Sequence, residues 1–298
     1  MFKKVMAGVL GVAYEESGPA DGAPVVLLHG FPYDVRAYDG VVPALAQAGC
    51  RVLVPYLRGF GPTCFLSADT QRSGQQAALG ADLLAFMDAL AVPQAVLAGY
   101  DWGGRAACIV AALWPERVQG LVTVDGYNIQ DIAHSIAPAR PEQEHRYWYQ
   151  YYLHTPRGQA GLSADRRAFC RLLWQLWSPT WQFGDSVFGA TAAAFDNPDF
   201  VDVVVHSYRH RFGYAPGDPA LDGIEQRLAL QPPIPVPTVV LHGADDGVSP
   251  PESPASQRRF TGPNWRRVVP GAGHNLPQEA PEPVIQAILE LISGTRND

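Results

Sequence analysis

The sequence AGYDWGGRA, residues 98–106, joins an apolar run to an apolar stretch with helical spacing. Its glycines, Gly99 and Gly103, flank Asp101 in the pattern Gly-x-Asp-x-Gly. A sharp strand-to-helix turn that displays a nucleophile normally has Ser at this centre, with small neighbours because the strand and the helix crowd there. A carboxylate is already ionised at neutral pH and needs no activating base. We therefore predict that Asp101 is a nucleophile rather than a helix N-cap, the other role that Asp commonly has at such a turn.

Short β-branched runs recur on both sides of this turn, and each ends in a turn signal. They are continuously apolar rather than alternating, which is typical of a parallel sheet covered on both faces. Helical stretches lie between them, and this alternation predicts an α/β fold with a mostly parallel sheet. An N-terminal β-hairpin, with Gly8 and Gly11 near its turn, is expected to precede them. The expected parallel strands are residues 24–30, 51–56, 95–100, 121–126, 237–243 and 266–273, with helices over residues 80–92 and 104–115.

The alternation breaks between about Ile129 and Leu230, a stretch that holds four of the seven tryptophans and six of the twelve tyrosines. The strand pattern resumes after the proline-rich sequence QPPIPVP, residues 231–237. We therefore expect two domains. Residues 1–128 and 231–298 form the core, and residues 129–230 form a helical cap inserted between two late strands of the core sheet.

The composition limits the class of partner. A formal net charge of −7 argues against a nucleic acid or an acidic membrane surface. No apolar run approaches the roughly 20 residues that a membrane-spanning helix needs. The four cysteines show neither a paired nor a metal-binding spacing, so we expect buried thiols and a cytoplasmic location. The expected partner is a small molecule, and the oligomeric state is left open.

Four motifs fall at the ends of expected strands, where ligands bind in open parallel sheets. They are HGFP at residues 29–32, the turn around Asp101, HGADDG at 242–247 and GAGH at 271–274. A nucleophile, then an acid, then a histidine is the chain order of the α/β-hydrolases. The alternative for His274 is a hydrogen-bonded loop histidine, but its place just before a C-terminal helical stretch favours a catalytic base.

On these motifs the chain resembles the α/β-hydrolase superfamily over nearly its whole length. Within it, HGFP and GYDWGG resemble the epoxide hydrolase branch, whose hallmarks are H-G-x-P, G-x-D-W-G-G and two cap tyrosines. The segment YQYYLHTPRG, residues 149–158, implies Tyr149 as one of these, and HSYRHR, residues 206–211, implies Tyr208. Tyr152, one helical turn from Tyr149, is the alternative.

The resemblance implies a reaction in which Asp101 attacks an apolar epoxide and forms an ester, while the two tyrosines donate hydrogen bonds and a proton. His274 then activates a water that hydrolyses the ester, and a vicinal diol leaves. The backbone N–H groups of Phe31 and Trp102 are expected to hold the oxyanion. No metal or organic cofactor is implied. The residues expected to contact the substrate are Tyr152, Trp148 and Pro32.

One acid must orient His274 and stabilise its cation. The family pattern G-x-x-D, counted from Gly243, selects Asp246. Asp125, at the end of LVTVDG, stands where some dehalogenase relatives carry this acid, and it is the alternative.

Three other functions are open. Haloalkane dehalogenases share the Asp, acid and His, but typically have Asn where this chain has Phe31. Fluoroacetate dehalogenase, which acts on a haloacid, resembles the chain at HGFP and Arg105, but has Arg where this chain has Trp102. A non-catalytic ligand-binding protein of the same fold is the third, although no catalytic residue is missing here.

Overall fold

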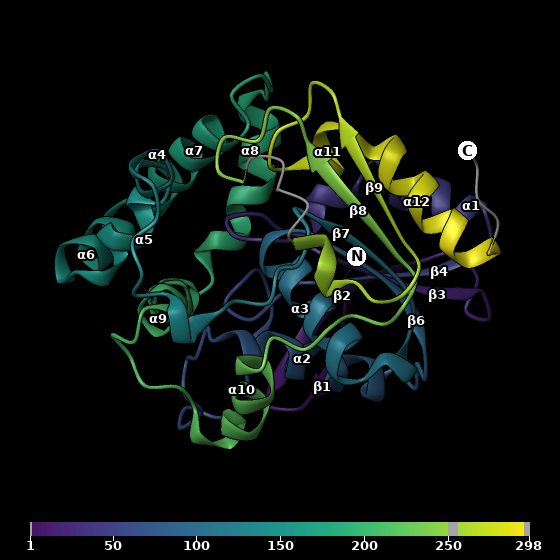
Figure 1. Ribbon diagram of the computed structural model, residues 1–298, viewed down its shortest axis with the longest axis horizontal. Coiled ribbons are helices and arrows are strands. Elements are labelled where there is room, and N and C mark those ends of the chain that lie inside the picture. The colour runs from purple at the N-terminus through teal and green to yellow at the C-terminus, as the bar shows by residue number, and fades with distance from the viewer. Residues whose placement is uncertain (1, 250–255, 295–298) are drawn as a thin grey trace.

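The central sheet of the computed structural model is mostly parallel (Figure 1). The structure describes residues 2–249 and 256–294. Within these ranges, nine strands form one sheet in the order β1-β2-β4-β3-β6-β7-β8-β9, with β5 paired to β2. The path from β4 to β9 is parallel, whereas β1 and β2 are antiparallel to their neighbours. The strands are β1 Lys3–Ala7, β2 Leu10–Ser17, β3 Ala23–Leu28, β4 Cys50–Pro55, β5 Cys64–Phe65, β6 Ala95–Gly99, β7 Val118–Val124, β8 Thr238–Gly243 and β9 Asn264–Val269.

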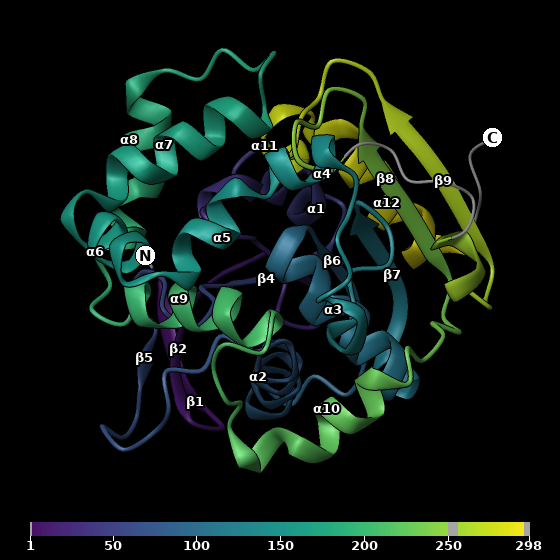
Figure 2. The same ribbon diagram turned by 60° about the vertical axis from the view of Figure 1, so that its left-hand side comes forward.

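Helices cover both faces of this sheet (Figures 1 and 2). On one face α3 packs on β6 and β7 with α2 beside it, and on the other α12 packs on β7 and β8 with α1 beside it. This arrangement confirms the predicted α/β fold. The helices are α1 Val42–Gln47, α2 Gln76–Ala89, α3 Asp101–Leu113, α4 Pro141–Arg146, α5 Trp148–His154, α6 Pro156–Ala164, α7 Arg166–Trp177, α8 Asp185–Ala192, α9 Phe200–Arg211, α10 Asp222–Ala229, α11 Leu276–Glu279 and α12 Pro281–Ser293.

The N-terminal hairpin is present, but its turn is tighter than expected. Ala7 pairs with Leu10, so only Gly8 and Val9 form the connection, and Gly11 lies within β2 opposite Met6. Gly8 has a φ of +56°, a conformation that glycine adopts without the steric cost of a side chain. The two glycines therefore have different roles: Gly8 makes the turn and Gly11 belongs to the strand.

All of residues 125–237 are described, and they separate β7 from β8 without adding a strand to the sheet. The segment expected as the cap, residues 129–230, contains helices α4 to α10. Figure 2 shows α5 to α9 gathered beside the sheet. No described helix combines the length and the apolar character that crossing a membrane requires.

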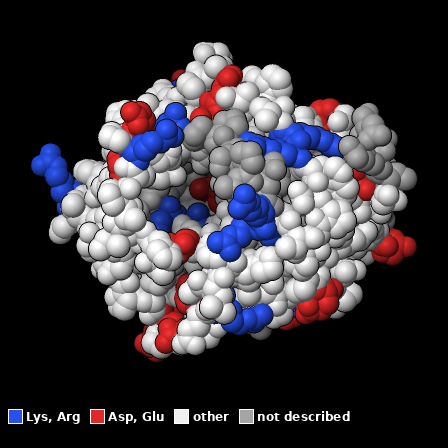
Figure 3. All heavy atoms as spheres, in the orientation of Figure 1, with Lys and Arg blue, Asp and Glu red and all other residues white. Residues whose placement is uncertain are grey.

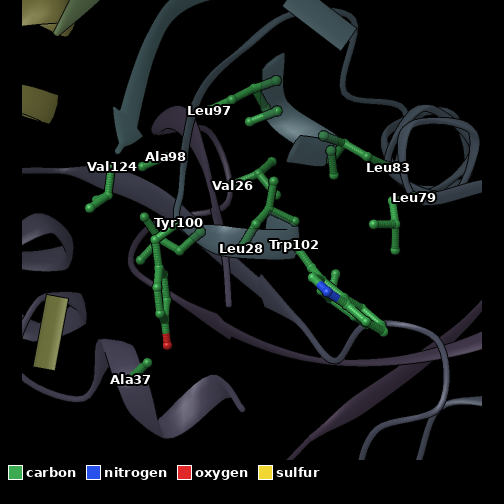
Figure 4. Packing of buried hydrophobic residues seen from close by; sticks show 14 of the residues in the cluster. Val26, Leu28, Ala37, Leu79, Leu83, Leu97, Ala98, Tyr100, Trp102 and Val124 are labelled. Atoms are coloured by element: carbon green, nitrogen blue, oxygen red, sulfur yellow. The ribbon is translucent and has the colours of Figure 1, made fainter. Parts of the chain in front are cut away.

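Buried hydrophobic residues pack around the turn that carries Asp101 (Figure 4). The side chains of Tyr100 and Trp102, its two neighbours in the chain, are fully buried. Tyr100 extends toward Ala37, and Trp102 points away from it. Burying two large aromatic side chains, one on each side, anchors the turn from within. Only the carboxylate between them is left at the end of the sheet.

Candidate active site

The backbone at Asp101 is strained in a way that local packing maintains. Asp101 has a φ of +49°, in the left-handed region that costs a non-glycine residue about 1–3 kcal/mol. A Cβ atom on Gly103 would lie 2.1 Å from the Leu28 carbonyl oxygen, and one on Gly30 would lie 2.6 Å from the Asp101 Cβ. These glycines let β3, β6 and α3 approach closely, so the end of the strand is forced to present Asp101.

The Asp101 carboxylate is aimed at two other groups. The Phe31 backbone N–H donates to its Oδ1 at 2.7 Å, and His274 Nε2 lies 3.9 Å from its Oδ2. The Trp102 N–H is in the first turn of α3, where N–H groups have no partner within the helix. Burial by itself raises the pKa of Asp101, but His274, Arg105 and the Phe31 N–H outweigh it and lower that pKa. The carboxylate is therefore ionised and available at neutral pH.

His274 lies in the loop after β9 and contacts two carboxylates. Its Nδ1 is 2.7 Å from Asp246 Oδ2 and 3.4 Å from Asp125 Oδ2. The other oxygen of Asp246 accepts from the backbone N–H groups of Val248 and Ser249, at 2.8 and 2.7 Å. Burial lowers the pKa of His274, but the carboxylates of Asp246 and Asp101 raise it well above its usual value. The resting site therefore favours the imidazolium.

The loop that carries His274 is fixed by a group to which the sequence interpretation gave no role. Glu279, in α11, accepts from Ser178 Oγ at 2.6 Å and from the backbone N–H groups of Gly273 and Asn275 at 2.7 and 3.0 Å. The Ser178 Oγ in turn accepts from the His274 N–H at 3.1 Å. In the sequence, the only indication of this role is that Glu279 follows His274 by five residues. The fold is needed to show which backbone N–H groups its carboxylate accepts from.

A cavity of about 780 Å³ opens at these residues. Figure 3 shows a hollow in this face of the molecule, with acidic and basic side chains inside it. Asp101, His274 and Tyr149 share this cavity. Its wall combines aromatic and apolar side chains with charged ones. The aromatic and apolar members include Tyr127, Ile129, Ile136, Tyr147, Tyr151, Phe212, Tyr214 and Val248, and the charged ones Arg105, Asp125, Asp131, Glu144 and Arg211.

The two cap tyrosines lie together but differ in their access to the cavity. Their rings are 5.3 Å apart and nearly perpendicular. Tyr149, on α5, lines the cavity and accepts a hydrogen bond from Gln150 Nε2 at 3.0 Å, which leaves its own O–H to donate. Tyr208, on α9, is 1% exposed, packs against Phe31, and is not part of the cavity wall. Burial raises the pKa of both phenols, so both are protonated at neutral pH.

The structure does not bring the three expected substrate contacts to this cavity. Tyr152 stacks on Phe169, and Trp148 packs against both of them. The Pro32 carbonyl accepts a hydrogen bond from Trp174 Nε1 at 2.8 Å. None of the three lines the cavity wall. The physical reason at α5 is that Trp148 and Tyr152 pack against Phe169 of α7, whereas Tyr149 and Tyr151 on the same helix line the cavity.

One group of described side chains has the spacing of a metal site. Ligand atoms of Asp125, Asp246 and His274 all lie within 4.8 Å of one another. The His274 Nδ1, however, is the atom that faces Asp246 at hydrogen-bond distance, so it carries the proton rather than a lone pair. This arrangement suits an acid–base pair better than a set of metal ligands.

Comparison with known proteins identifies the family of the chain. A family model described as alpha/beta hydrolase fold matches residues 23–281. A solved structure of a candidate epoxide hydrolase from Klebsiella pneumoniae subsp. pneumoniae is 49% identical, with a TM-score of 0.95 over 97% of this chain and 96% of that one. Epoxide hydrolase A of Mycobacterium tuberculosis is 27% identical over 92% of this chain and 91% of its own length.

The match to some curated relatives is shorter. Bifunctional epoxide hydrolase 2 of Mus musculus is 36% identical over 109 residues, which is 37% of this chain and 19% of that protein. The family model covers most of the present chain, and the Klebsiella structure matches it nearly end to end. The chain therefore belongs to the α/β-hydrolase superfamily, in its epoxide hydrolase-like branch.

Proposed function

We propose that the protein is an epoxide hydrolase that converts an apolar epoxide to a vicinal diol through a covalent ester on Asp101. The observation that supports this most is the meeting, in one cavity, of an ionised carboxylate, an imidazole and a protonated phenol. Asp101, His274 and Tyr149 bring them from α3, the loop after β9, and α5. A carboxylate suits an epoxide because the ring carbon is open to direct attack and no activating base is needed.

In the first half-reaction an Asp101 oxygen forms a bond to a ring carbon, and the carbon–oxygen bond of the epoxide breaks. The epoxide oxygen keeps the electron pair and takes a proton from Tyr149. The ring of Tyr208 packs against the ring of Tyr149. The raised pKa of both tyrosines keeps the proton in place until the alkoxide develops.

In the second half-reaction His274 removes a proton from water, and the hydroxide formed attacks the Asp101 ester carbon. The N–H groups of Phe31 and Trp102 stabilise the oxyanion. Collapse breaks the bond between the Asp101 carbon and the diol oxygen, and this oxygen takes the proton from the imidazolium. The proton that remains on the Asp101 carboxyl group returns to the Tyr149 phenolate, so the carboxylate and the phenol are both restored. Asp246 stabilises that imidazolium.

The ester itself prepares His274 for this second role. In the resting site the Asp101 carboxylate is one of the groups that raise the pKa of His274. Esterification removes that negative charge, so the pKa of His274 falls and the neutral imidazole becomes available as a base. The two half-reactions are thereby ordered by electrostatics alone.

Haloalkane dehalogenation is the second candidate function. Trp102 Nε1 is buried and meets no acceptor among the described residues, which suits a donor to a halide leaving group, but Trp102 does not line the cavity. The side chain of Phe31 offers no second donor, and this favours the epoxide. None of the four cysteines, all in the described part of the chain, forms a disulfide, which supports the cytoplasmic location that we propose for the enzyme.

The decisive experiment traps the ester. His274→Gln should react once with an epoxide such as styrene oxide, because attack by Asp101 needs no base while ester hydrolysis does. Intact-protein mass spectrometry should then find one adduct of substrate mass, which peptide mapping locates at Asp101. The exposed His145→Gln is the matched control and should turn over normally. Diol formation by His274→Gln without any adduct would exclude the covalent route.

A further inference from the structure

The cavity contains two arginines whose charge the proposed reaction does not use. Arg105 lies on α3 four residues after Asp101, so both are on one face of that helix. Arg211 is the last residue of α9 and reaches the same cavity from the other side. Arg105 is only 7% exposed. Two guanidinium groups thus converge beside the nucleophile.

The partners of both arginines are neutral. Arg105 Nε donates to the Asn128 carbonyl at 3.2 Å, and Arg211 Nη1 donates to Gln150 Oε1 at 3.1 Å. The hydrogen-bond network orients the Gln130 amide so that its oxygen faces both guanidinium groups, at 3.3 Å from Arg105 Nη2 and 2.6 Å from Arg211 Nη2. Neither arginine forms an ion pair with an acidic residue in the part of the chain that the structure describes.

The bridging glutamine is itself held in place. The Gln130 N–H donates to Gln76 Oε1 at 2.8 Å, and its carbonyl accepts from Gln76 Nε2 at 3.3 Å and from Gln231 Nε2 at 3.0 Å. These bonds tie its backbone to α2 and to the connection that precedes β8. The two arginines are therefore positioned by a fixed neutral acceptor, which orients them without neutralising them.

Two acidic residues of the cavity wall have partners other than the arginines. Asp131 pairs with His134 at 2.9 Å, and Glu144 accepts from the Tyr151 hydroxyl. The remaining acidic residues of the wall are Asp125, which lies 3.4 Å from His274 Nδ1, and Asp101, whose pKa Arg105 helps to lower. Burial and Arg211 lower the pKa of Arg105 to about 10, so its guanidinium group stays charged at neutral pH. Once Asp101 is esterified, positive charge remains in the cavity.

We propose that the epoxide carries a carboxylate, and that Arg105 and Arg211 together bind it. A planar carboxylate has two oxygens that two guanidinium groups can share, each in a charge-assisted hydrogen bond. The arginines also offset the repulsion that an anionic substrate would feel from Asp101. Because Arg105 is one helical turn from Asp101, the carboxylate lies a few bonds from the attacked carbon, and the aromatic wall contacts an apolar remainder. This inference rests on the proposed function for the identity of the reacting group.

The first test compares trans-3-phenylglycidate with its methyl ester, which lacks the negative charge and carries one additional methyl group. Wild-type protein should show the higher kcat/KM for the acid. Arg105→Met and Arg211→Met should each reduce the acid-to-ester ratio about 10-fold or more, since a hydrogen bond to a charged group is lost. Arg209→Met is the matched control: it removes the same charge from the same helix but lies outside the cavity wall, and should keep the ratio.

The second test needs no turnover. Titration calorimetry of wild-type protein should detect binding of 3-phenylpropionate but not of 3-phenylpropionamide. Arg211→Lys should weaken the binding of 3-phenylpropionate, because lysine keeps the charge but loses the planar pair of donors. Binding of the carboxylate without hydrolysis of any epoxide would overturn the proposed function and leave the anion site standing. The opposite result has two parts: the epoxide of the methyl ester is opened at least as fast as that of the acid, and 3-phenylpropionate does not bind. That result would overturn the anion site and leave epoxide hydrolysis standing.

Discussion

At His274, two carboxylates lie within reach of one ring nitrogen. Asp246 is the nearer to Nδ1, at 2.7 Å against 3.4 Å for Asp125. Asp246 also accepts two backbone N–H groups from the residues that follow it. These bonds fix the orientation of its carboxylate. Distance and orientation therefore both favour Asp246 as the acid that we propose.

Asp246→Asn should impair hydrolysis of the ester far more than its formation. The neutral amide cannot stabilise the imidazolium and leaves Nδ1 without its acceptor, at a cost of about 10²- to 10⁴-fold in the hydrolysis rate. Asp125→Asn, the matched control, should change that rate only modestly. Pre-steady-state alkylation and hydrolysis rates for both variants decide the question, and the reverse ranking would assign the role to Asp125.

At the scale of the element, helix α5 decides which tyrosine meets the cavity. Tyr149 and Tyr152 are three residues apart, which places them near one another on the helix surface. In the structure Tyr149 turns to the cavity, while Tyr152 leans on Phe169 of α7. Helix periodicity alone does not distinguish Tyr149 from Tyr152. The aromatic contact with α7 does, and no rule of sequence spacing predicts that contact.

Tyr149→Phe should slow ring opening by about 10²- to 10⁴-fold, because a positioned proton donor is removed from the cavity. Tyr152→Phe makes the same chemical change on the same helix and should leave the rate within a few-fold of wild type. Stopped-flow measurement of the alkylation step under single-turnover conditions compares the two directly. A silent Tyr149→Phe beside a damaged Tyr152→Phe would show that α5 presents the other tyrosine.

At the scale of the whole molecule, the site is assembled from the carboxyl end of the sheet and from the helices between β7 and β8. The carboxyl end of the sheet supplies Asp101, Asp246 and His274, and the helices between β7 and β8 supply Tyr149 and Tyr208. Enclosure between these parts buries the charged groups, and burial makes each charge act strongly on its neighbours. In this enclosed site Asp101 and His274 act on each other, so the pKa of Asp101 is lowered and the pKa of His274 is raised.

The two half-reactions should therefore respond differently to pH. The pKa of Asp101 is lowered and those of the tyrosines are raised, so alkylation should be flat from mildly acidic to mildly alkaline pH. Ester hydrolysis needs neutral His274, whose pKa is raised by Asp246, so its rate should fall as pH drops and the imidazolium persists. Rapid-quench mass spectrometry should find more ester at low pH. A parallel loss of both rates on acidification would contradict this ordering.

The local features of the protein could be predicted from its sequence. The alternation of apolar runs and helical stretches indicated the α/β fold, and Gly-x-Asp-x-Gly indicated the turn, because both depend on short-range sterics and on periodicity. The order of Asp101, the acid and His274 followed from motifs at strand ends. The strand limits moved by a few residues, as at β7, which begins at Val118 rather than at residue 121. End positions depend on pairing with neighbouring strands.

The long-range choices came only from the tertiary structure. The two arginines are 106 positions apart in the chain, on α3 and α9, and their shared acceptor Gln130 lies on neither helix. No local pattern relates them, since their meeting depends on how the segment between β7 and β8 packs over the sheet. Tertiary packing also places Tyr152 and Trp148 against Phe169 rather than in the cavity wall. It brings Glu279 into hydrogen-bond contact with the backbone on both sides of His274. The local sequence determines the nucleophile Asp101 and the strand-to-helix turn that carries it. The packing of elements distant in the chain determines which side chains line the cavity around it.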